Sequence, residues 1–351
     1  MLFMGVTLHN RSPYEKVSTY ERVVAEDRTK FSKTGFMIQF DEAAEKMGVD
    51  TMRYLYARQN PTSDLRFGYG LGDEARRQLL SLWNIYAFFV TYARLDQPNF
   101  SGFQLPKELN DSDRWLLARL YRFVEQTTQA MEEFQTSLVI REFDSFIDDV
   151  SNWYVRSNRR RFWKSGMNEE KQVGYWILYQ TLKQTTIVMA PIIPFVTEAI
   201  WQNVIRSLEP EASESVHLAD WPTLEPSWQE ETMLTQAEHV RQILNLALRL
   251  RNQTKLKVRQ PLTTLYLSAP RDVLSAARTM EPLILNELNI KSLEYLEDET
   301  SLQTPYLELD FRKAGPILKG NVQKAKELLA SLNDEALAQA VNAYDSHQPV
   351  S

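Results

Sequence analysis

The sequence has 351 residues, which is enough for two or three domains with cores of their own. It contains no cysteine, and this excludes a disulfide framework, a cysteine-ligated zinc site and a thiol nucleophile. Its formal net charge is -6, so binding to nucleic acid has to come from local basic patches and not from a general attraction.

The first 60 residues predict short elements. Apolar Met1–Leu8 is typical of a helix end, and because it has no cap we expect it to belong to the interior of a longer fold. The other expected elements are a strand at Lys16–Val24, a basic loop at Arg28–Thr34 and two short helices at Asp41–Met47 and Asp50–Arg58. These two helices meet at a turn on Gly48, and Asp50 is the predicted N-cap of the second.

A helical bundle is predicted after a turn-rich linker. Asn60–Gly72 carries a proline and three glycines, and we place a domain boundary there. Apolar residues then recur at helical spacing as far as about Ser207. Beside the central helix described next, the expected helices are Asp73–Leu95, Asp113–Phe134, Gly174–Met189 and Pro194–Ile205, the last opened by its proline.

The central helix is expected at Leu138–Trp163 and has two contrasting faces. Its apolar side carries Phe143, Phe146, Ile147, Val150, Trp153 and Tyr154. The opposite side carries Asn152, Arg156, Arg159, Arg160 and Trp163. Guanidinium groups beside an indole suit RNA, since phosphates accept from arginine and bases stack on aromatic rings; the alternative is a solvated helix face. Arg161 projects toward the apolar side, so we expect it to pair with Asp148 or Asp149.

The last third predicts a small α/β domain. The expected elements are helices at Ala237–Asn252, Asp272–Leu288, Val322–Leu332 and Asp334–Tyr344, and strands at Leu262–Ser268, Leu293–Leu296 and Tyr306–Asp310. Between the first helix and the first strand, Lys255, Lys257 and Arg259 alternate. In an extended segment they share one face, and either phosphate contact or plain solvation would account for them.

Several phrases in the chain resemble isoleucyl-tRNA synthetases. Asn152–Trp163 reads Asn-Trp-Tyr-Val-Arg-Ser-Asn-Arg-Arg-Arg-Phe-Trp, close to a signature of the anticodon-binding helical domain in that family. The other matching segments are Leu82–Ala93, Pro191–Trp201, Ser215–Pro222, Arg259–Leu262 and Phe311–Gly320, so the resemblance covers nearly the whole chain. It implies a mainly α fold in three parts. These are the end of the class I nucleotide-binding fold with its stem-contact region (1–65), an anticodon-binding helical bundle (66–222) and a small α/β C-terminal domain (223–351).

The basic loop resembles the Lys-Met-Ser-Lys-Ser signature of class I synthetases. The resemblance implies ATP contacts by Lys30, Ser32 and Lys33, with Lys33 stabilising the triphosphate in the transition state. Phe36-Met37 stands where the family has Gly-Asn. No His-Ile-Gly-His-type signature occurs in the sequence, and the resemblance leads us to expect that the family's amino-acid pocket and editing domain are also absent from it. We therefore expect no catalysis and no cofactor for this chain alone, and ATP with Mg²⁺ only when a catalytic half completes the site.

Three functions follow from this resemblance. The first is a module that binds the anticodon stem-loop of a tRNA, with an isoleucine acceptor implied, through Asn152, Arg156, Arg159, Arg160, Trp163, Lys255, Lys257 and Arg259. The second is one half of a split ligase, active in ATP-dependent isoleucylation of tRNA only with its missing half. The third is a degenerate paralogue that binds protein as a scaffold. For all three we expect a cytoplasmic protein with no metal site, no DNA partner and no membrane contact, because the sequence has no signal peptide, no membrane-length apolar run and no metal-ligand spacing among its four histidines.

Overall fold

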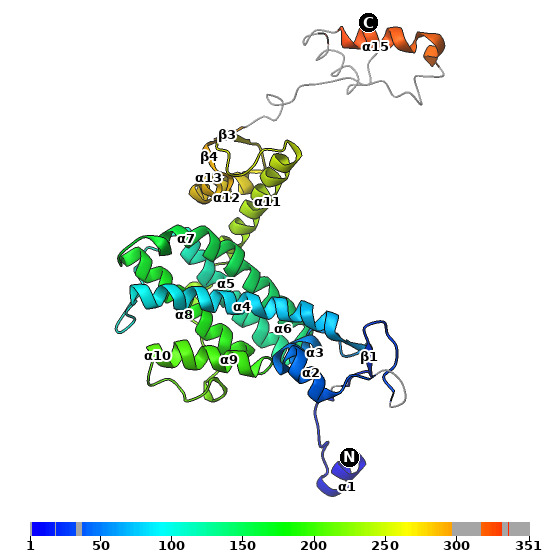
Figure 1. The fold of residues 1–351 in the computed structure, drawn as a ribbon, viewed down its shortest axis with the longest axis vertical. Coiled ribbons are helices and arrows are strands. Elements are labelled where there is room, and N and C mark those ends of the chain that lie inside the picture. Colours follow the sequence, from blue (N-terminus) through cyan, green and yellow to red (C-terminus); the bar gives the residue numbers. More distant parts are fainter. Residues whose placement is uncertain (1, 18, 33–36, 297–316, 332–335, 337–351) are drawn as a thin grey trace. The chain divides into compact units, whose positions relative to one another are not determined.

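The fold described here is that of a computed structural model, which describes residues 2–17, 19–32, 37–296, 317–331 and 336 (Figure 1). The chain forms two compact units. The first consists of residues 1–261 and 275–289, and the second of residues 262–274 and 290–351. These borders differ from the three ranges expected from the sequence, and the three-part domain organisation stays a prediction.

The N-terminal elements are short and pair with one another. Helix α1 (Leu2–His9) is followed by strand β1 (Val23–Ala25), which pairs in parallel with β2 (Leu65–Phe67). The predicted strand at Lys16–Val24 was therefore wrong in extent, because only the residues that β2 reaches form a ladder. Helices α2 (Phe40–Met47) and α3 (Val49–Arg58) confirm the two predicted short helices.

The predicted cap at Asp50 was wrong, and the carboxylate has a different partner. The chain turns at Gly48, which has a φ of 86° and takes the N-cap position of α3 itself. The Asp50 carboxylate accepts hydrogen bonds from the backbone N–H groups of Phe195 (3.3 Å) and Val196 (2.7 Å). These groups lie in the first turn of α9 (Pro194–Ile200), where N–H donors have no partner within their own helix. Asp50 therefore joins α3 to α9 over a large sequence separation.

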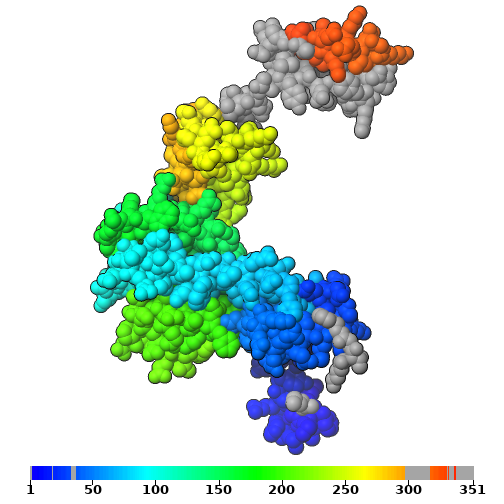
Figure 2. Space-filling model, in the orientation of Figure 1, coloured from blue at the N-terminus to red at the C-terminus, as the bar shows by residue number. Residues whose placement is uncertain are grey.

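The core of the first unit is a bundle of long helices: α4 (Tyr69–Asp96), α5 (Asp111–Glu132), α6 (Thr136–Asp148) and α8 (Glu169–Met189). Large side chains from all four are buried, including Phe89, Phe123, Phe146 and Tyr179. Helices α2 and α3 pack on α4, and in the space-filling view their blue residues lie against its cyan ones (Figure 2). None of the helices in the described part of the chain has the length and apolarity to cross a membrane.

The central helix is continuous from Thr136 to Trp163, but its middle is not α-helical. A π-helical segment, η1 (Asp149–Val155), lies between α6 and α7 (Arg156–Trp163). Phe143, Phe146, Ile147, Val150 and Tyr154 are buried, as predicted, and Trp153 is half-buried. The helical period therefore predicted the apolar face, while the π segment was not foreseen.

The next segment folds back beside α8. After α9 the chain continues through a π segment, η2 (Trp201–Ile205), one turn of α10 (Arg206–Leu208) and the short 3₁₀ turns η3 (Val216–Leu218) and η4 (Pro226–Trp228). The Glu198 carboxylate on α9 accepts from the Ser215 hydroxyl and the Val216 N–H, both at 2.9 Å. Gln202 also donates to it, at 2.6 Å. Burial alone would raise the pKa of Glu198, but these hydrogen bonds together hold it below its usual value.

The C-terminal part begins with α11 (Glu231–Gln253). The helix predicted at Asp272–Leu288 is divided into α12 (Arg271–Thr279) and α13 (Glu281–Leu288), because Pro282 suits the first turn of a new helix. Within the second unit, β3 (Leu262–Leu267) pairs in parallel with β4 (Ile290–Tyr295). The turn η6 (Lys319–Asn321) leads into α15 (Val322–Ala330). The strand expected at Tyr306–Asp310 lies outside the described residues, as does most of the helix expected at Asp334–Tyr344. Of the segment Phe311–Gly320, which resembles the synthetases, residues 311–316 also lie outside them.

Candidate nucleic-acid interface

The outer face of α7 and the middle of η1 bring five of the predicted contact residues together. Asn152, Arg156, Arg159, Arg160 and Trp163 are all exposed. Trp163 is 57% exposed, and its indole Nε1 donates to the Tyr92 hydroxyl at 2.7 Å, which fixes the ring at the surface. We call these five residues the α7 face.

The charges of the α7 face are unequally occupied. Arg156 lies 3.3 Å from a Glu287 carboxylate oxygen, and Asn152 donates to Asp148 at 2.5 Å. Arg159 and Arg160 form no ion pair or side-chain hydrogen bond with any residue that the structure describes. Two neighbouring guanidinium groups with free donors, beside an exposed indole, can take a phosphate and an aromatic base.

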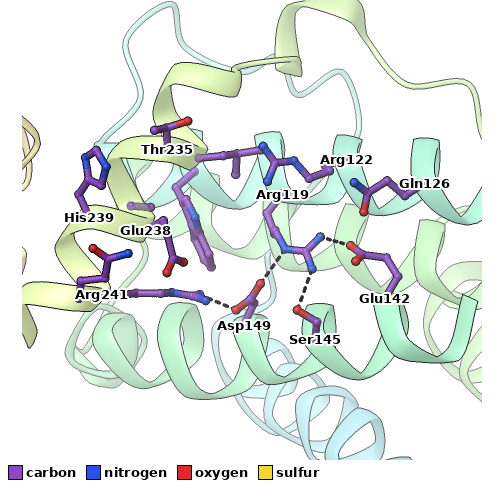
Figure 3. A pocket seen from close by; sticks show the side chains of 14 residues that line it. Arg119, Arg122, Gln126, Glu142, Ser145, Asp149, Thr235, Glu238, His239 and Arg241 are labelled. Atoms are coloured by element: carbon purple, nitrogen blue, oxygen red, sulfur yellow. Dashed lines mark hydrogen bonds and ion pairs between the residues drawn. The ribbon is translucent and has the colours of Figure 1, made fainter. Parts of the chain in front are cut away.

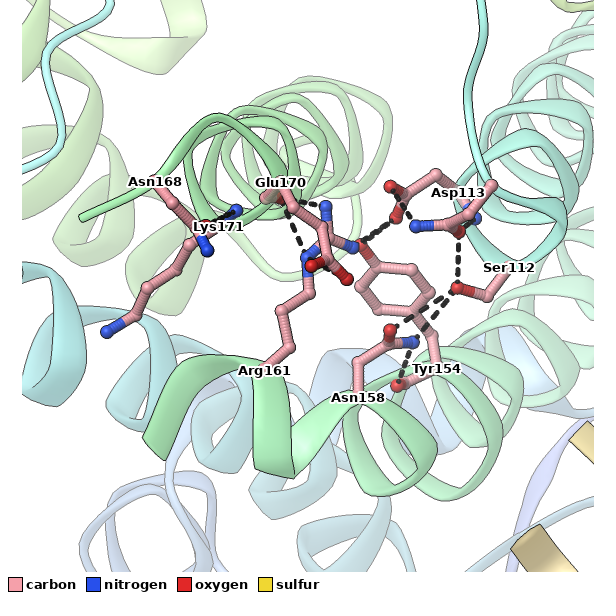
Figure 4. A network of polar contacts seen from close by, with 9 residues as sticks. Ser112, Asp113, Tyr154, Asn158, Arg161, Asn168, Glu170 and Lys171 are labelled. Carbon is pink, nitrogen blue, oxygen red and sulfur yellow. Dashed lines mark hydrogen bonds and ion pairs between the residues drawn. The ribbon is translucent and has the colours of Figure 1, made fainter. Parts of the chain in front are cut away.

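A buried polar network holds the opposite side of α7 in place (Figure 4). Arg161 is buried and its Nη1 lies 2.8 Å from the carboxylate of Asp113 on α5. The sequence correctly predicted a buried, paired Arg161, but Asp148 and Asp149 were the wrong partners: Asp148 binds Asn152, and Asp149 binds two other arginines. The Tyr154 hydroxyl also donates to Asp113, at 2.6 Å. Burial, and after it the Asp113 charge, raises the pKa of Tyr154 well above its usual value, so this hydroxyl stays a donor.

The network requires a glycine on α8. Arg161 donates to the backbone carbonyl of Glu170, and its guanidinium lies over Gly174. A Cβ on Gly174 would come within 2.9 Å of the guanidinium carbon. Because Asp113 and the Glu170 carbonyl both hold Arg161, this side of α7 is fixed against the bundle and the α7 face is left exposed.

The basic stretch after α11 does not form the predicted extended segment. Lys255 has a left-handed backbone with φ 57°, and the Gln260 N–H donates to the Lys257 carbonyl in a turn. The prediction that Lys255, Lys257 and Arg259 share one strand face was therefore wrong, although all three side chains are exposed. We call residues 254–260 the basic loop of α11.

A buried arginine, not foreseen from the sequence, causes this turn. Arg251 is 4% exposed and donates to the carbonyls of Lys257 and Gln260, both at 3.1 Å, and to that of Leu288 at 2.7 Å. The loop closes around one guanidinium group, which donates to four carbonyl groups when the longer contact with Asn289 (3.5 Å) is included. In the sequence Arg251 is one of several basic residues in a row, and nothing there distinguishes it from its exposed neighbours.

A polar cleft of about 420 Å³ lies between α5, α6 and α11 (Figure 3). Its arginines are occupied: Arg119 pairs with Glu142 (2.5 Å) and Asp149 (2.6 Å), and Arg241 pairs with Asp149 (2.5 Å). The Arg241 guanidinium carbon also lies 4.6 Å from the centre of the Trp153 ring. These contacts join α11 to the bundle, and they are long-range pairs that the sequence pattern did not predict.

The loop at Arg28–Thr34, which resembles the Lys-Met-Ser-Lys-Ser signature, is described only in part. Lys30 and Ser32 are exposed, and the backbone of Lys30 pairs with that of Val24. Lys33 lies outside the described residues, so the predicted ATP contacts of Lys30, Ser32 and Lys33 stay predictions. Across the part of the chain that the structure covers, no group of three or more His, Asp or Glu side chains has the arrangement of a metal site.

Comparison with known proteins identifies the bundle. Residues 113–266 match the family model described as the anticodon-binding domain of tRNA ligase. The matched region contains the α7 face and the basic loop of α11.

Similar proteins extend this match over most of the chain. The isoleucine–tRNA ligase of Thermus thermophilus is 35% identical over 341 residues, which is 94% of this chain and 33% of that protein. Isoleucine–tRNA ligase 2 of Bacillus cereus is 33% identical over 350 residues, with 97% of this chain and 33% of that protein covered. The chain thus spans about a third of the length of these relatives.

A solved structure shares the fold. LeuRS of Agrobacterium radiobacter K84, in a ternary complex with tRNA and LeuAMS, aligns with a TM-score of 0.50 at 15% identity over 65% of this chain and 27% of that one. The family-model and sequence matches confirm the resemblance found in the sequence: residues 113–266 are similar to the anticodon-binding domain of tRNA ligase, and the similar proteins over most of the chain are isoleucine–tRNA ligases.

Proposed function

We propose that this chain binds the anticodon stem-loop of a tRNA with an isoleucine acceptor. The observation that carries the proposal is the α7 face, where Arg159 and Arg160 have free donors beside the exposed Trp163. Single-stranded RNA loops are recognised by arginine on phosphates and by aromatic rings under bases. The basic loop of α11 adds three exposed cations that can follow the RNA backbone.

Support for tRNA as the RNA comes from the relatives. The family description names an anticodon-binding domain, and the similar proteins are named as isoleucine–tRNA ligases. We also propose a cytoplasmic location, because a tRNA-binding role belongs with the cell's translation machinery. No residue of the described surface identifies the acceptor by itself, so the choice of isoleucine rests on these relatives.

The test is binding of the purified chain to isoleucine tRNA and to one unrelated tRNA between about 50 and 200 mM salt, a range over which phosphate contacts weaken strongly. Arg159→Glu/Arg160→Glu should weaken binding at least tenfold and lower the slope of log K against log salt by about 1.5, since two phosphate contacts are lost. The matched control is Arg11→Glu/Arg77→Glu, which changes the net charge equally at exposed positions away from the α7 face. Equal losses in both double variants would contradict a local interface. Absence of tRNA binding would leave the protein scaffold as the better function.

A second proposal concerns catalysis. Because the chain spans about a third of its relatives, ATP-dependent isoleucylation of tRNA requires the remaining parts of a ligase. We propose that Lys30, Ser32 and Lys33 contact ATP, with Mg²⁺ bound to the nucleotide, only when a separate catalytic half is present. ATP–pyrophosphate exchange should appear on mixing the two halves and be lost in Lys33→Ala. If mixing restores no exchange, the split-ligase function is wrong.

A further inference from the structure

One carboxylate lies directly on the α7 face. Glu287, in the last turn of α13, places one oxygen 3.3 Å from Nη2 of Arg156 and accepts from the Ser157 hydroxyl at 2.9 Å with the other. Its side chain is 19% exposed, whereas that of Arg156 is 59% exposed. The carboxylate is therefore held at two points, and its arginine partner remains open to solvent on the other side.

The same end of α13 contacts the basic loop of α11. The Leu288 carbonyl accepts from Arg251, which also closes that loop, and the Asn289 side-chain amide donates to the Val258 carbonyl at 3.0 Å. These contacts set the position of Glu287 independently of its own ion pair. An acidic side chain is thus built into the junction that touches both predicted RNA-contacting segments.

We propose that Glu287 is a specificity-determining residue of the RNA surface, and this inference rests on the proposed function. Glu287 occupies Arg156, so this arginine binds a phosphate only when the RNA places that phosphate well enough to replace the carboxylate. An RNA backbone that is held loosely contacts Arg159 and Arg160 and is repelled by the Glu287 carboxylate. An RNA that fits the surface gains Arg156 as well, and the difference in affinity between the two RNAs is larger than without Glu287.

The experiment compares the full chain with Glu287→Gln, which keeps the side-chain shape and the acceptor for Ser157. Binding is measured to isoleucine tRNA, to an unrelated tRNA and to mixed-sequence single-stranded RNA at several salt concentrations. Glu287→Gln should raise the affinity for the two non-matching RNAs about three- to tenfold and steepen their salt dependence by about 0.7, the value for one added phosphate contact on a single strand. The control Glu45→Gln, at an exposed position on α2, makes the same charge change and should alter these affinities less than twofold.

Two further variants separate Glu287 from a general charge effect. With Arg156→Gln already present, Glu287→Gln should produce less than a twofold gain, because no arginine is left to release. Arg156→Gln alone should weaken isoleucine tRNA at least fivefold more than it weakens the non-matching RNAs, because the unpaired Glu287 charge acts on every RNA whereas only the matching RNA also loses the Arg156 contact. If the gain from Glu287→Gln persists without Arg156, or if Arg156→Gln weakens all RNAs equally, the inference is overturned.

The outcomes also separate this inference from the proposed function. A gain on single-stranded RNA that depends on Arg156, without any preference for isoleucine tRNA, supports the Glu287 contact and contradicts the proposed function. The opposite outcome is that isoleucine tRNA binds in a way that requires Arg159 and Arg160, while Glu287→Gln changes the affinity for none of the RNAs. That result supports the proposed function and contradicts the Glu287 inference. No RNA binding by either protein contradicts both.

Discussion

The buried pair of Asp113 and Arg161 allows the sharpest prediction of stability. Arg161→Leu removes the guanidinium and leaves the Asp113 carboxylate, whose side chain is 1% exposed, without its counter-charge. Breaking a buried pair from one side costs about 3–5 kcal/mol. Asp113 keeps the Tyr154 hydroxyl and the Asn110 side-chain amide as donors, and it lies in the first turn of α5, where the helix dipole favours an anion. We therefore expect a loss near the lower end of that range, about 3 kcal/mol.

The double variant tests the cause of this loss. Asp113→Asn/Arg161→Leu removes both charges, so no isolated ion stays buried, and its cost should be smaller than the sum of the single costs by at least about 1.5 kcal/mol. Urea unfolding followed by far-UV circular dichroism and tryptophan fluorescence measures these differences, with coincident transitions required for a two-state treatment. A loss below about 1 kcal/mol for Arg161→Leu, or strict additivity in the double variant, would refute the argument from an uncompensated buried charge.

Three further predictions use other contacts. A Cβ on Gly68 would come within 2.3 Å of the Glu26 side chain, whose carboxylate accepts from the Leu71 N–H at the start of α4. Gly68→Ala and Glu26→Ala should therefore each lower the free energy of unfolding in urea by about 1–2 kcal/mol. The two losses should not add in the double variant, and full additivity would contradict a shared mechanism. Because the folded-state pKa of Glu198 lies below its unfolded value, the unchanged protein should be more stable than Glu198→Gln above about pH 4.5. This difference in stability should decline as the pH falls through the folded-state pKa. A difference in melting temperature between the two proteins that stays constant from about pH 3 to 7 would be the contrary result. Arg251→Met should speed amide hydrogen exchange throughout the basic loop of α11. Arg249→Met, at an exposed position of the same helix, should leave the exchange rates of that loop unchanged. Equal exchange rates in the two variants would mean that Arg251 does not close the loop.

The two faces of the central helix were predictable because helical spacing is a local property. Residues three and four apart share a side whether the partner helices are known or not, and so the buried Phe143 and Tyr154 and the exposed Arg159 followed from the pattern. The π-helical segment did not follow from it, since a run of seven residues is too short to separate a period of 4.4 from one of 3.6.

Partners across the fold were not predictable in the same way. The need of Arg161 for a carboxylate could be stated from burial alone, yet several acids satisfied that need equally well in the sequence. Asp113 is 48 positions away, and only the fold, which brings the start of α5 to the buried side of α7, selects it. Asp50 shows the same limit: it has the residue type and position of a local cap, but the free N–H groups of a distant helix hold it instead.

The basic loop of α11 shows that charge alone does not predict which basic residues are available to bind an anion. Arg251, Lys255, Lys257 and Arg259 look like members of one cationic run, but they divide into two roles. Arg251 is buried and uses its donors on backbone carbonyls, so its charge is not available to an anion in solution. The other three stay exposed because Arg251 has folded the backbone beneath them. Removing Arg251 should therefore weaken RNA binding through the shape of the loop, whereas removing Lys257 should weaken it through one phosphate contact and lower the salt dependence by about 0.7.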